Sequence, residues 1–361
     1  MAEEKNTLIQ TIGRGAISNT TGRFESLYQE IDLSNYGWHD PEDETFLKTK
    51  FYCDTSKSIL TENKSPDLPF RFSMNFYRGC EHGCIYCYAR PTHEFLGLSA
   101  GLDFESKIFV KENAPALLRE KFMSPRWQPE SINISGVTDC YQPAERKFKL
   151  TRQCLEICAE FRNPVTLITK NHLITRDIDI LKDLAKDNLV FTLLSITTLD
   201  AELGRLLEPR TSAPLARLQA IEELAQAGVP VGVNIAPVIP GLTEHEMPAI
   251  LKAAAEAGAK TAGYVPVRLP YSVADLFTEW LEKNRPGAKN KILNSIRDLR
   301  AGKLNDPEFE TRMHGFGPRA DQMAQMFNLF SKKYGFGENY IPLSTTHFHR
   351  LGEQLNFFNN K

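Results

Sequence analysis

The sequence predicts an α/β protein whose centre is a partial (β/α)6 TIM-type barrel. From residue 70 onward, six short apolar runs rich in β-branched residues alternate with amphipathic helical stretches. This alternation is typical of βα units around a parallel sheet. The chain has 361 residues, of which 42% are hydrophobic and 24% charged. That composition is ordinary for a globular protein, and the length suffices for one barrel with extensions.

Six strands are expected, in chain order, at 70–76, 131–136, 164–169, 189–196, 229–237 and 261–269. Helices are expected between them, including those at 114–122, 150–161, 177–187, 214–228 and 244–258. The last two helices end at glycine, which helix C-termini favour. Right-handed crossovers between these units predict a closed or partly closed barrel. A doubly wound open sheet is the alternative, because periodicity does not distinguish the two.

The barrel is expected to occupy residues 70–285. Residues 1–69 are rich in Gly, Asn, Ser and Asp and show little periodicity, so we expect an extended N-terminal arm there. Residues 286–361 are expected to form a C-terminal extension that contains two helices and, from residue 344, a loose tail.

The composition argues against several classes of protein. With a net charge of −2 and a pI near 6.5, the chain as a whole has no positive electrostatic field that would attract nucleic acid or anionic membranes. The start, MAEEKNTLIQ, is acidic where a signal peptide is basic, and the apolar run 229–242 is too short to cross a bilayer. Seven cysteines, three of them clustered, favour metal binding in a reduced compartment over disulfides. We therefore expect a cytoplasmic protein without a membrane partner.

Three of the cysteines follow the first predicted strand with CxxxCxxC spacing: Cys80, Cys84 and Cys87. Active sites of βα barrels form at the carboxyl ends of their strands. Gly79 and Gly83 allow the backbone to turn sharply beside these thiols. Iron–sulfur clusters normally take four cysteines. With only three, one iron keeps an open position that can bind a substrate, as a catalytic zinc does.

The spacing alone leaves two other interpretations open. A structural zinc site could use the three cysteines together with His82, His93 or Cys140. An electron-transfer cluster could recruit a fourth cysteine from elsewhere in the chain.

With the aromatic Tyr86 just before its last cysteine, the CxxxCxxC segment resembles the radical S-adenosylmethionine (radical SAM) superfamily. The resemblance implies a [4Fe-4S] cluster on Cys80, Cys84 and Cys87, whose fourth iron binds the amino and carboxylate groups of SAM. It also implies a reductant such as flavodoxin or ferredoxin, and cleavage of SAM to a 5′-deoxyadenosyl radical that abstracts hydrogen from a substrate. The protein would then supply geometry and exclude water.

Further site residues are expected where each strand gives way to polar sequence, because those strand ends face the site. The candidates are Gly136, Thr138, Asp139, Lys170, Ser195, Thr197, Asn234, Val238 and Ile239. Lys170 is placed to pair with the SAM carboxylate. Ser195 and Thr197 are expected to hydrogen-bond the methionyl or ribose part, and Val238 and Ile239 to pack on adenine. Each candidate also has a purely structural interpretation, as a loop, capping or core residue.

A narrower resemblance is to the spore photoproduct lyase-like branch of the superfamily. It rests on five segments in the same order, YRGCEHGCIYCYAR, LITKN, LLSITT, LEPRTS and AGVPVGVNIAPVIPG, which lie within residues 70–270. The resemblance implies that these carry the cluster loop, the lysine and serine for SAM, and two following elements. Tyr86 is expected to contact adenine, and Arg210 is either a site cation or a helix-cap partner. Similarity nearly end to end, including GRGAISNTTGRFE, is to bacterial radical SAM proteins whose substrate is not established.

One departure from that branch concerns the hydrogen-donating cysteine of spore photoproduct lyase. Alignment on SGVTD places Gly136 at its position. Cys140 comes four residues later and could donate a hydrogen atom from a nearby loop, but a lone cysteine is more often a small buried hydrophobe. Repair of a DNA dimer is therefore a weaker expectation than radical SAM chemistry in general.

The substrate stays open among nucleic acid, peptide and small molecule. A basic stretch beside the barrel mouth is either a phosphate track or a solvated face: Arg146, Lys147, Phe148, Lys149 and Arg152. Arg268, after the sixth strand, either reaches a substrate anion or forms a surface ion pair. The rival class is a nucleic-acid-binding module in which the three cysteines serve only as a metal staple.

Overall fold

The computed structural model describes residues 13–24, 47–337 and 342–350. Its main sheet has seven strands in the order β10-β9-β8-β7-β6-β3-β2. Six of them correspond to the predicted strands: β3 (Phe72–Met74), β6 (Ile132–Ile134), β7 (Val165–Thr169), β8 (Val190–Ser195), β9 (Val231–Val238) and β10 (Thr261–Pro266). Each lies within its predicted range, except that β9 ends one residue later. The short apolar runs are thus the core strands of the protein.

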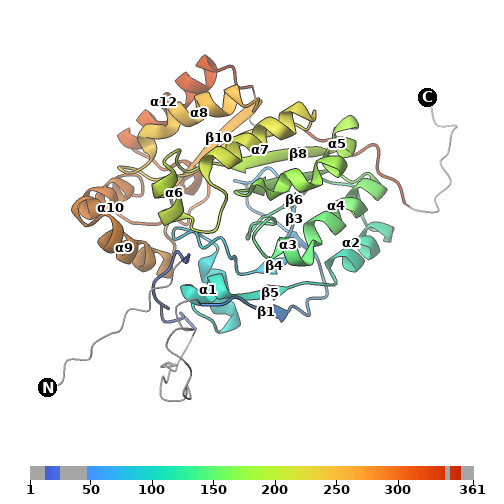
Figure 1. Ribbon diagram of the computed structural model, residues 1–361, viewed down its shortest axis with the longest axis horizontal. Coiled ribbons are helices and arrows are strands. Elements are labelled where there is room, and N and C mark those ends of the chain that lie inside the picture. The colour runs from blue at the N-terminus through green and yellow to red at the C-terminus, as the bar shows by residue number, and fades with distance from the viewer. Residues whose placement is uncertain (1–12, 25–46, 338–341, 351–361) are drawn as a thin grey trace.

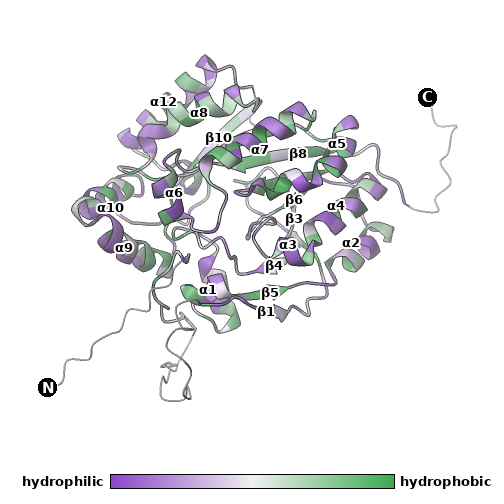
Figure 2. Ribbon diagram, viewed as in Figure 1, coloured by the Kyte–Doolittle hydropathy of each residue, from purple (hydrophilic) through white to green (hydrophobic). Residues whose placement is uncertain are grey.

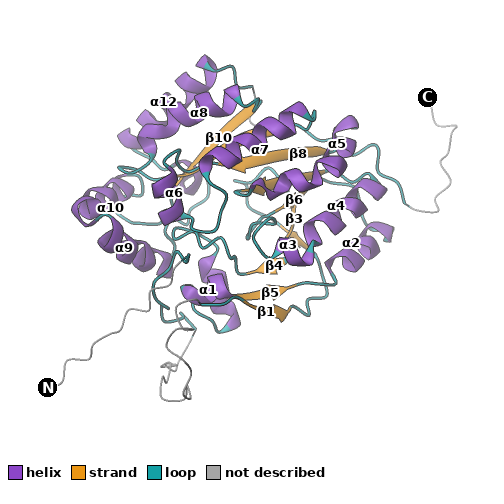
Figure 3. Cartoon of the chain, in the orientation of Figure 1, coloured by secondary structure: helices purple, strands orange, loops and turns teal. Residues whose placement is uncertain are grey.

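The strand order decides between the two predicted architectures. Each of the six strands pairs in parallel with the next one along the chain. A doubly wound sheet would reverse its order at a switch point, whereas continuous order is the winding of a βα barrel. The edge beside β3 carries β2 (Leu60–Glu62), which runs antiparallel. The fold is therefore a partial barrel, with strands inside and helices outside (Figure 3).

Helices cover the outer face of the sheet (Figure 1). They are α2 (Ala114–Met123), α3 (Glu145–Phe148), α4 (Leu150–Phe161), η4 (His172–Asp177), α5 (Ile178–Lys186), α6 (Ala201–Leu207), α7 (Pro214–Gln226), η5 (Glu244–Glu246) and α8 (Met247–Glu256). In Figure 2 these helices alternate hydrophilic and hydrophobic colour, while β8 is largely hydrophobic. The apolar faces of α2, α4, α5, α7 and α8 join the strands in one continuous core, whereas Leu203 and Leu207 of α6 belong to a second apolar cluster.

A second, smaller sheet has the order β1-β5-β4 and lies at the opposite side of the molecule from α8 (Figure 1). Its strands are β1 (Lys50–Cys53), β4 (Tyr77–Arg78) and β5 (Lys107–Val110), accompanied by η3 (Arg90–Leu96) and α1 (Leu102–Ser106). The arm thus contributes two strands, β1 and β2, where no regular structure was expected. Three of the four β1 residues are exposed, so the strand lacks the alternation that a sequence search needs.

The C-terminal extension packs on the barrel. Helix α9 (Ser272–Asn284) precedes it, at the end of the range expected for the barrel, and the helices of the extension itself are η6 (Pro286–Ala288), α10 (Lys289–Asp298), α11 (Thr311–His314) and α12 (Pro318–Lys333). Helix α12 lies on α8, and α9 and α10 form a second apolar cluster with Ile85 and Tyr86. That cluster brings the extension against the cysteine loop.

The expectation of a loose tail is wrong for residues 344–350, the part of the tail that the structure describes. Phe348 packs against the rings of Phe122 and Phe161, with centroids 5.9 and 6.3 Å apart. The backbone N–H of His349 donates to the carbonyl of Phe161 at 3.1 Å. The aromatic contacts of Phe348 and backbone hydrogen bonds therefore anchor residues 344–350, while the rest of the tail, 351–361, lies outside the described residues. In the parts of the chain that are described, no helix is both long and apolar enough to cross a membrane.

Candidate active site

The three cysteines of the CxxxCxxC segment lie in one loop between β4 and η3. Gly79 and Gly83 there have φ values of 84° and 68°, which glycine adopts without strain. Cys80 and Cys84 are buried, Cys87 is partly buried, and all three are free thiols. We call residues 79–88 the cluster loop.

The donor set of this loop suits an iron–sulfur cluster. Burial raises the pKa of all three thiols, and for Cys80 the charges of Asp139, Cys84 and Cys87 raise it further. Thiols held together out of water favour a bound metal that takes over their charge. Among the described residues, no three Cys, His, Asp or Glu side chains are placed to hold a single ion. A [4Fe-4S] cluster does not need such convergence, because each thiolate binds a different iron.

Asp139, predicted at the rim, lies against the cluster loop. Its carboxylate accepts hydrogen bonds from the Lys170 backbone N–H at 2.8 Å and the Thr169 hydroxyl at 2.7 Å, and it faces His82 Nδ1 at 3.4 Å. Burial raises the pKa of Asp139, but His82 and these hydrogen bonds lower it by more. The carboxylate therefore stays charged, and its negative charge contributes to the raised pKa of Cys80.

The Lys170 ammonium also lies beside the loop. It donates to the Ala236 carbonyl at 2.6 Å and to the Thr197 hydroxyl at 3.1 Å, and it pairs with Glu208 at 3.0 Å. Burial, followed by the charge of Arg217, lowers the pKa of Lys170 to about 7. Because all three ammonium protons already have acceptors, a bound carboxylate must replace one of them.

Glu208 is the central acceptor of this network, and the sequence analysis missed it. Its Oε1 accepts from the Tyr86 hydroxyl and from the Thr197 hydroxyl, the latter at 2.6 Å. Its Oε2 pairs with Arg217, and both side chains are almost completely buried. The signal in the sequence was its place in the LEPRTS segment, of which only Arg210 was named as a candidate.

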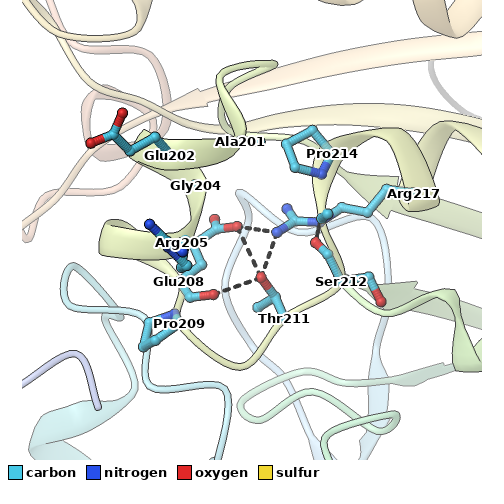
Figure 4. A pocket seen from close by; sticks show the side chains of 11 residues that line it. Ala201, Glu202, Gly204, Arg205, Glu208, Pro209, Thr211, Ser212, Pro214 and Arg217 are labelled. Carbon is cyan, nitrogen blue, oxygen red and sulfur yellow. Dashed lines mark hydrogen bonds and ion pairs between the residues drawn. The ribbon is translucent and has the colours of Figure 1, made fainter. Parts of the chain in front are cut away.

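A pocket of about 510 Å³ opens between α6 and α7 behind this network (Figure 4). Figure 4 shows the Arg217 guanidinium between Glu208 and Thr211, and Arg217 donates to the Thr211 hydroxyl at 2.6 Å. The lining reaches Glu208 but none of the three cysteines. The pocket therefore borders the network without being the place for a cluster.

The candidates on β8 and β9 come together at one level of the barrel. Ser195 and Asn234 are register partners on these neighbouring strands, so their side chains point to the same face of the sheet. The Ser195 carbonyl also accepts a hydrogen bond from Arg217 at 2.9 Å. Just beyond β9, Ile239 is buried in the same apolar cluster as Tyr86. Val238, at the end of β9, is instead part of the main core.

The backbone at Gly136 lies close to the side chain of Ser73 on β3. A Cβ added there would lie 2.9 Å from the Cβ of Ser73, so a thiol does not fit at Gly136 without a shift of β3. The Gly136 carbonyl accepts from the Tyr88 hydroxyl at 3.0 Å, and Thr138 donates to the Tyr77 carbonyl at 2.8 Å. The first bond holds the loop after β6 against the cluster loop, and the second holds it against β4.

The two candidate arginines have different surroundings. Arg210 pairs with Glu81 of the cluster loop at 3.1 Å and reaches the Thr49 hydroxyl at 3.4 Å. It joins the loop to the arm, and its role in binding SAM stays a prediction. The Arg268 guanidinium lies 5.5 Å from the centre of the Tyr88 ring.

Cys140 is buried in the main hydrophobic core. Its backbone N–H donates to the Ser135 hydroxyl at 2.9 Å, and its carbonyl accepts from the Thr151 hydroxyl at 2.6 Å. Burial, followed by the charge of Asp139, raises the pKa of the thiol. This environment is the one expected for apolar packing, and a hydrogen-donating role for Cys140 stays a prediction.

Part of the basic stretch is already engaged. Arg152 pairs with Asp177 at 3.1 Å and with Asp179 at 2.7 Å. The Lys147 ammonium lies 4.9 Å from the ring centre of Phe148. These contacts reduce the positive charge available to a phosphate backbone.

Residues 74–254 match the radical SAM superfamily. An uncharacterised protein of Mycobacterium tuberculosis (strain ATCC 25618 / H37Rv) is 35% identical over 259 residues, which cover 70% of this chain and 74% of that protein. An uncharacterised protein of Methanocaldococcus jannaschii is 30% identical over 191 residues, which cover 53% and 68% respectively.

Solved structures of spore photoproduct lyase share the fold. A mutant with bound AdoMet and dinucleoside spore photoproduct gives a TM-score of 0.57 at 15% identity and covers 81% of both chains. A second mutant gives a TM-score of 0.58 at 15% identity, with 80% of this chain and 82% of that chain covered. The sequence match over the barrel settles the family: this chain belongs to the radical SAM superfamily, whose members use a [4Fe-4S] cluster and S-adenosylmethionine.

Proposed function

We propose that this protein is a radical SAM enzyme in which Cys80, Cys84 and Cys87 hold a [4Fe-4S] cluster. One observation carries the proposal: three desolvated thiols in a single loop lie beside Lys170, whose charge counteracts the rise that burial causes in the pKa of Cys84 and Cys87. When bound, the cluster and SAM supply a 5′-deoxyadenosyl radical that abstracts a hydrogen atom from substrate. A flavodoxin or ferredoxin is the proposed reductant.

The chain's own residues orient SAM in this proposal. Lys170 offers a positive charge to the SAM carboxylate, since charge-assisted hydrogen bonds are the stronger ones. Ser195 and Asn234 add polar groups from β8 and β9 at one level of the barrel. Tyr86 and Ile239 share an apolar cluster and provide a surface for adenine. Residues of α9 and α10 belong to the same apolar cluster of side chains. Because they help to bury it, water is kept from the reacting groups.

Anaerobic reconstitution of the full chain with iron and sulfide tests the proposal. We expect about four irons per chain and, with dithionite, conversion of SAM to 5′-deoxyadenosine. The triple variant Cys80→Ala, Cys84→Ala and Cys87→Ala should lose both the bound iron and the conversion of SAM. The matched control is Cys53→Ala, which removes an exposed thiol on β1 and should keep both. A colourless zinc protein that retards oligonucleotides would instead support the metal-stapled binding module.

A repair reaction like that of spore photoproduct lyase is the second candidate, supported by the similarity of fold. The crowding of Gly136 against Ser73 argues against it, because the donor thiol of that reaction has no place here. Reconstituted protein should leave dinucleoside spore photoproduct unchanged, and release of thymidine from it would favour the repair reaction. The substrate class is found by following deuterium from labelled nucleic acid, peptide or small molecules into 5′-deoxyadenosine.

A further inference from the structure

A buried ion pair lies directly against the cluster loop. Arg90 and Glu105 pair with side chains that are both 0% exposed. The Arg90 guanidinium also donates to the backbone carbonyls of Gly83 and Cys84, at 3.0 and 2.9 Å. Burial raises the pKa of Cys87, and the Arg90 charge offsets part of that rise. Arg90 therefore fixes both the shape of the loop and part of its electrostatic environment.

The remaining partners of Glu105 come from the N-terminal arm. The Gly15 N–H donates to one carboxylate oxygen of Glu105 at 3.0 Å, and the Ala16 N–H donates to the other at 2.8 Å. The Arg14 guanidinium donates to the Glu105 backbone carbonyl. A buried carboxylate needs such partners, because an unpaired charge out of water is costly.

The arm reaches Glu105 only because three glycines allow the backbones to meet. A Cβ on Gly15 would lie 1.7 Å from the Gly83 carbonyl oxygen. A Cβ on Gly83 would lie 2.7 Å from a Glu105 carboxylate oxygen, and one on Gly101 would lie 2.1 Å from the Ser18 carbonyl oxygen. Any side chain at Gly15 must push the arm off the cluster loop.

A second connection runs from the arm to the residue after the first cysteine. Arg14 donates to the Leu47 carbonyl at 2.6 Å and to the Thr49 hydroxyl at 3.1 Å. The Thr49 hydroxyl donates to the Glu81 carboxylate at 2.7 Å. The arm thus contacts the cluster loop at two places between Cys80 and Cys84, at Glu81 and at Gly83.

We propose that the arm is part of the metal site and that five residues, Arg14, Gly15, Ala16, Arg90 and Glu105, position the cluster loop. We call this set the arm clamp. Its hydrogen bonds keep the loop closed over the thiols and keep Glu105 and Arg90 mutually neutralised. Without the arm, the buried pair is exposed to water and the loop opens locally. This inference rests on the proposed function for the identity of the metal, but its first test needs no metal.

The first test measures how fast the thiols of the metal-free, full-length chain react with 4,4′-dithiodipyridine, site by site, by peptide mass spectrometry. Gly15→Ala and Glu105→Gln should each speed the labelling of Cys80 and Cys84 about tenfold, the effect of losing one charge-assisted hydrogen bond. Gly287→Ala is the matched control, since a Cβ there meets nothing within 4 Å. Labelling at the wild-type rate in both clamp variants would overturn the proposal.

The second test uses cluster-loaded protein. Glu105→Gln leaves the Arg90 charge unbalanced near the cluster, so its midpoint potential should become less negative, and a chelator should remove iron faster. Circular dichroism shows whether the Gly15→Ala variant folds. If it does not, the test relies on Glu105→Gln, which keeps the volume of the side chain. A wild-type chain that takes up no cluster refutes the proposed function and leaves the labelling result standing. If the wild-type chain takes up the cluster normally and Glu105→Gln has the same midpoint potential and loses iron to the chelator at the same rate as the wild type, the arm clamp is refuted.

Discussion

Lys170 and Glu208 form an ion pair across 3.0 Å beside the cluster loop. The lysine follows β7 and the glutamate follows α6, so their meeting depends on how two βα units pack. The same Glu208 oxygen accepts from Tyr86 and Thr197. The cation expected to bind SAM is therefore held in place by a carboxylate of the LEPRTS segment, in which the sequence analysis singled out only Arg210.

Replacing Lys170 by methionine should weaken SAM binding. The variant keeps most of the side-chain volume but removes a charged donor, so we expect an affinity about ten- to a hundredfold lower. Anaerobic equilibrium dialysis of cluster-loaded protein measures this. Lys182→Met, at an exposed position on α5, is the control and should bind like the wild type. An unchanged affinity in Lys170→Met would remove Lys170 from the SAM site.

Neutralising Glu208 should destabilise the fold. The variant Glu208→Gln leaves Arg217 as a buried charge without its carboxylate, and breaking such a pair costs about 3–5 kcal/mol. Urea unfolding of the metal-free chain measures the free energy of unfolding. Glu202→Gln, at an exposed position on α6, should have little effect. Equal midpoints for both variants would show that the Glu208–Arg217 pair contributes little.

His93 should make the protein less stable in mild acid. The imidazole is buried, its Nε2 lies 3.0 Å from the Lys107 carbonyl, and its Nδ1 has no partner among the described residues. Burial lowers the pKa of His93 from 6.5 to about 4. Between these values the unfolded chain takes up a proton that the folded chain does not. The free energy of unfolding should therefore fall by about 3 kcal/mol as the pH drops from 6.5 to 4, and stay level in this respect below pH 4.

Urea unfolding at several pH values, compared with His93→Phe, isolates that contribution. A phenyl ring can keep the contacts with Phe104 and Phe109 without a titrating group. The difference in the free energy of unfolding between the two proteins should change between pH 6.5 and 4 and be constant above and below this range. A difference that does not vary with pH would mean that His93 titrates normally in the folded protein.

The contact between Gly136 and Ser73 should tolerate no added atom. Gly136→Ala places a Cβ 2.9 Å from the Ser73 Cβ, and such overpacking costs about 1–3 kcal/mol. Ser73→Gly makes room, so the double variant should recover much of the loss. Thermal unfolding of the four proteins measures the coupling. Strict additivity of the two changes would show that the residues do not meet.

Much of the barrel could be predicted because its signals are local. Apolar, β-branched runs of a few residues locate all six parallel strands, and CxxxCxxC spacing identifies a metal-binding loop at a strand end. Two strands of the smaller sheet, β1 and β4, could not be found this way. Strand β1 is mostly exposed, and β4 has only two residues, so neither carries a periodic pattern.

The sequence by itself determined the barrel strands, the three thiols and the family. Only the tertiary structure decided which charges meet: Lys170 with Glu208, and Arg90 and the arm with Glu105. The physical reason is that these partners come from separate elements and gain their energy from shared burial. Periodicity and spacing describe neighbours along the chain, whereas the cost of taking a charge out of water depends on what surrounds it in space.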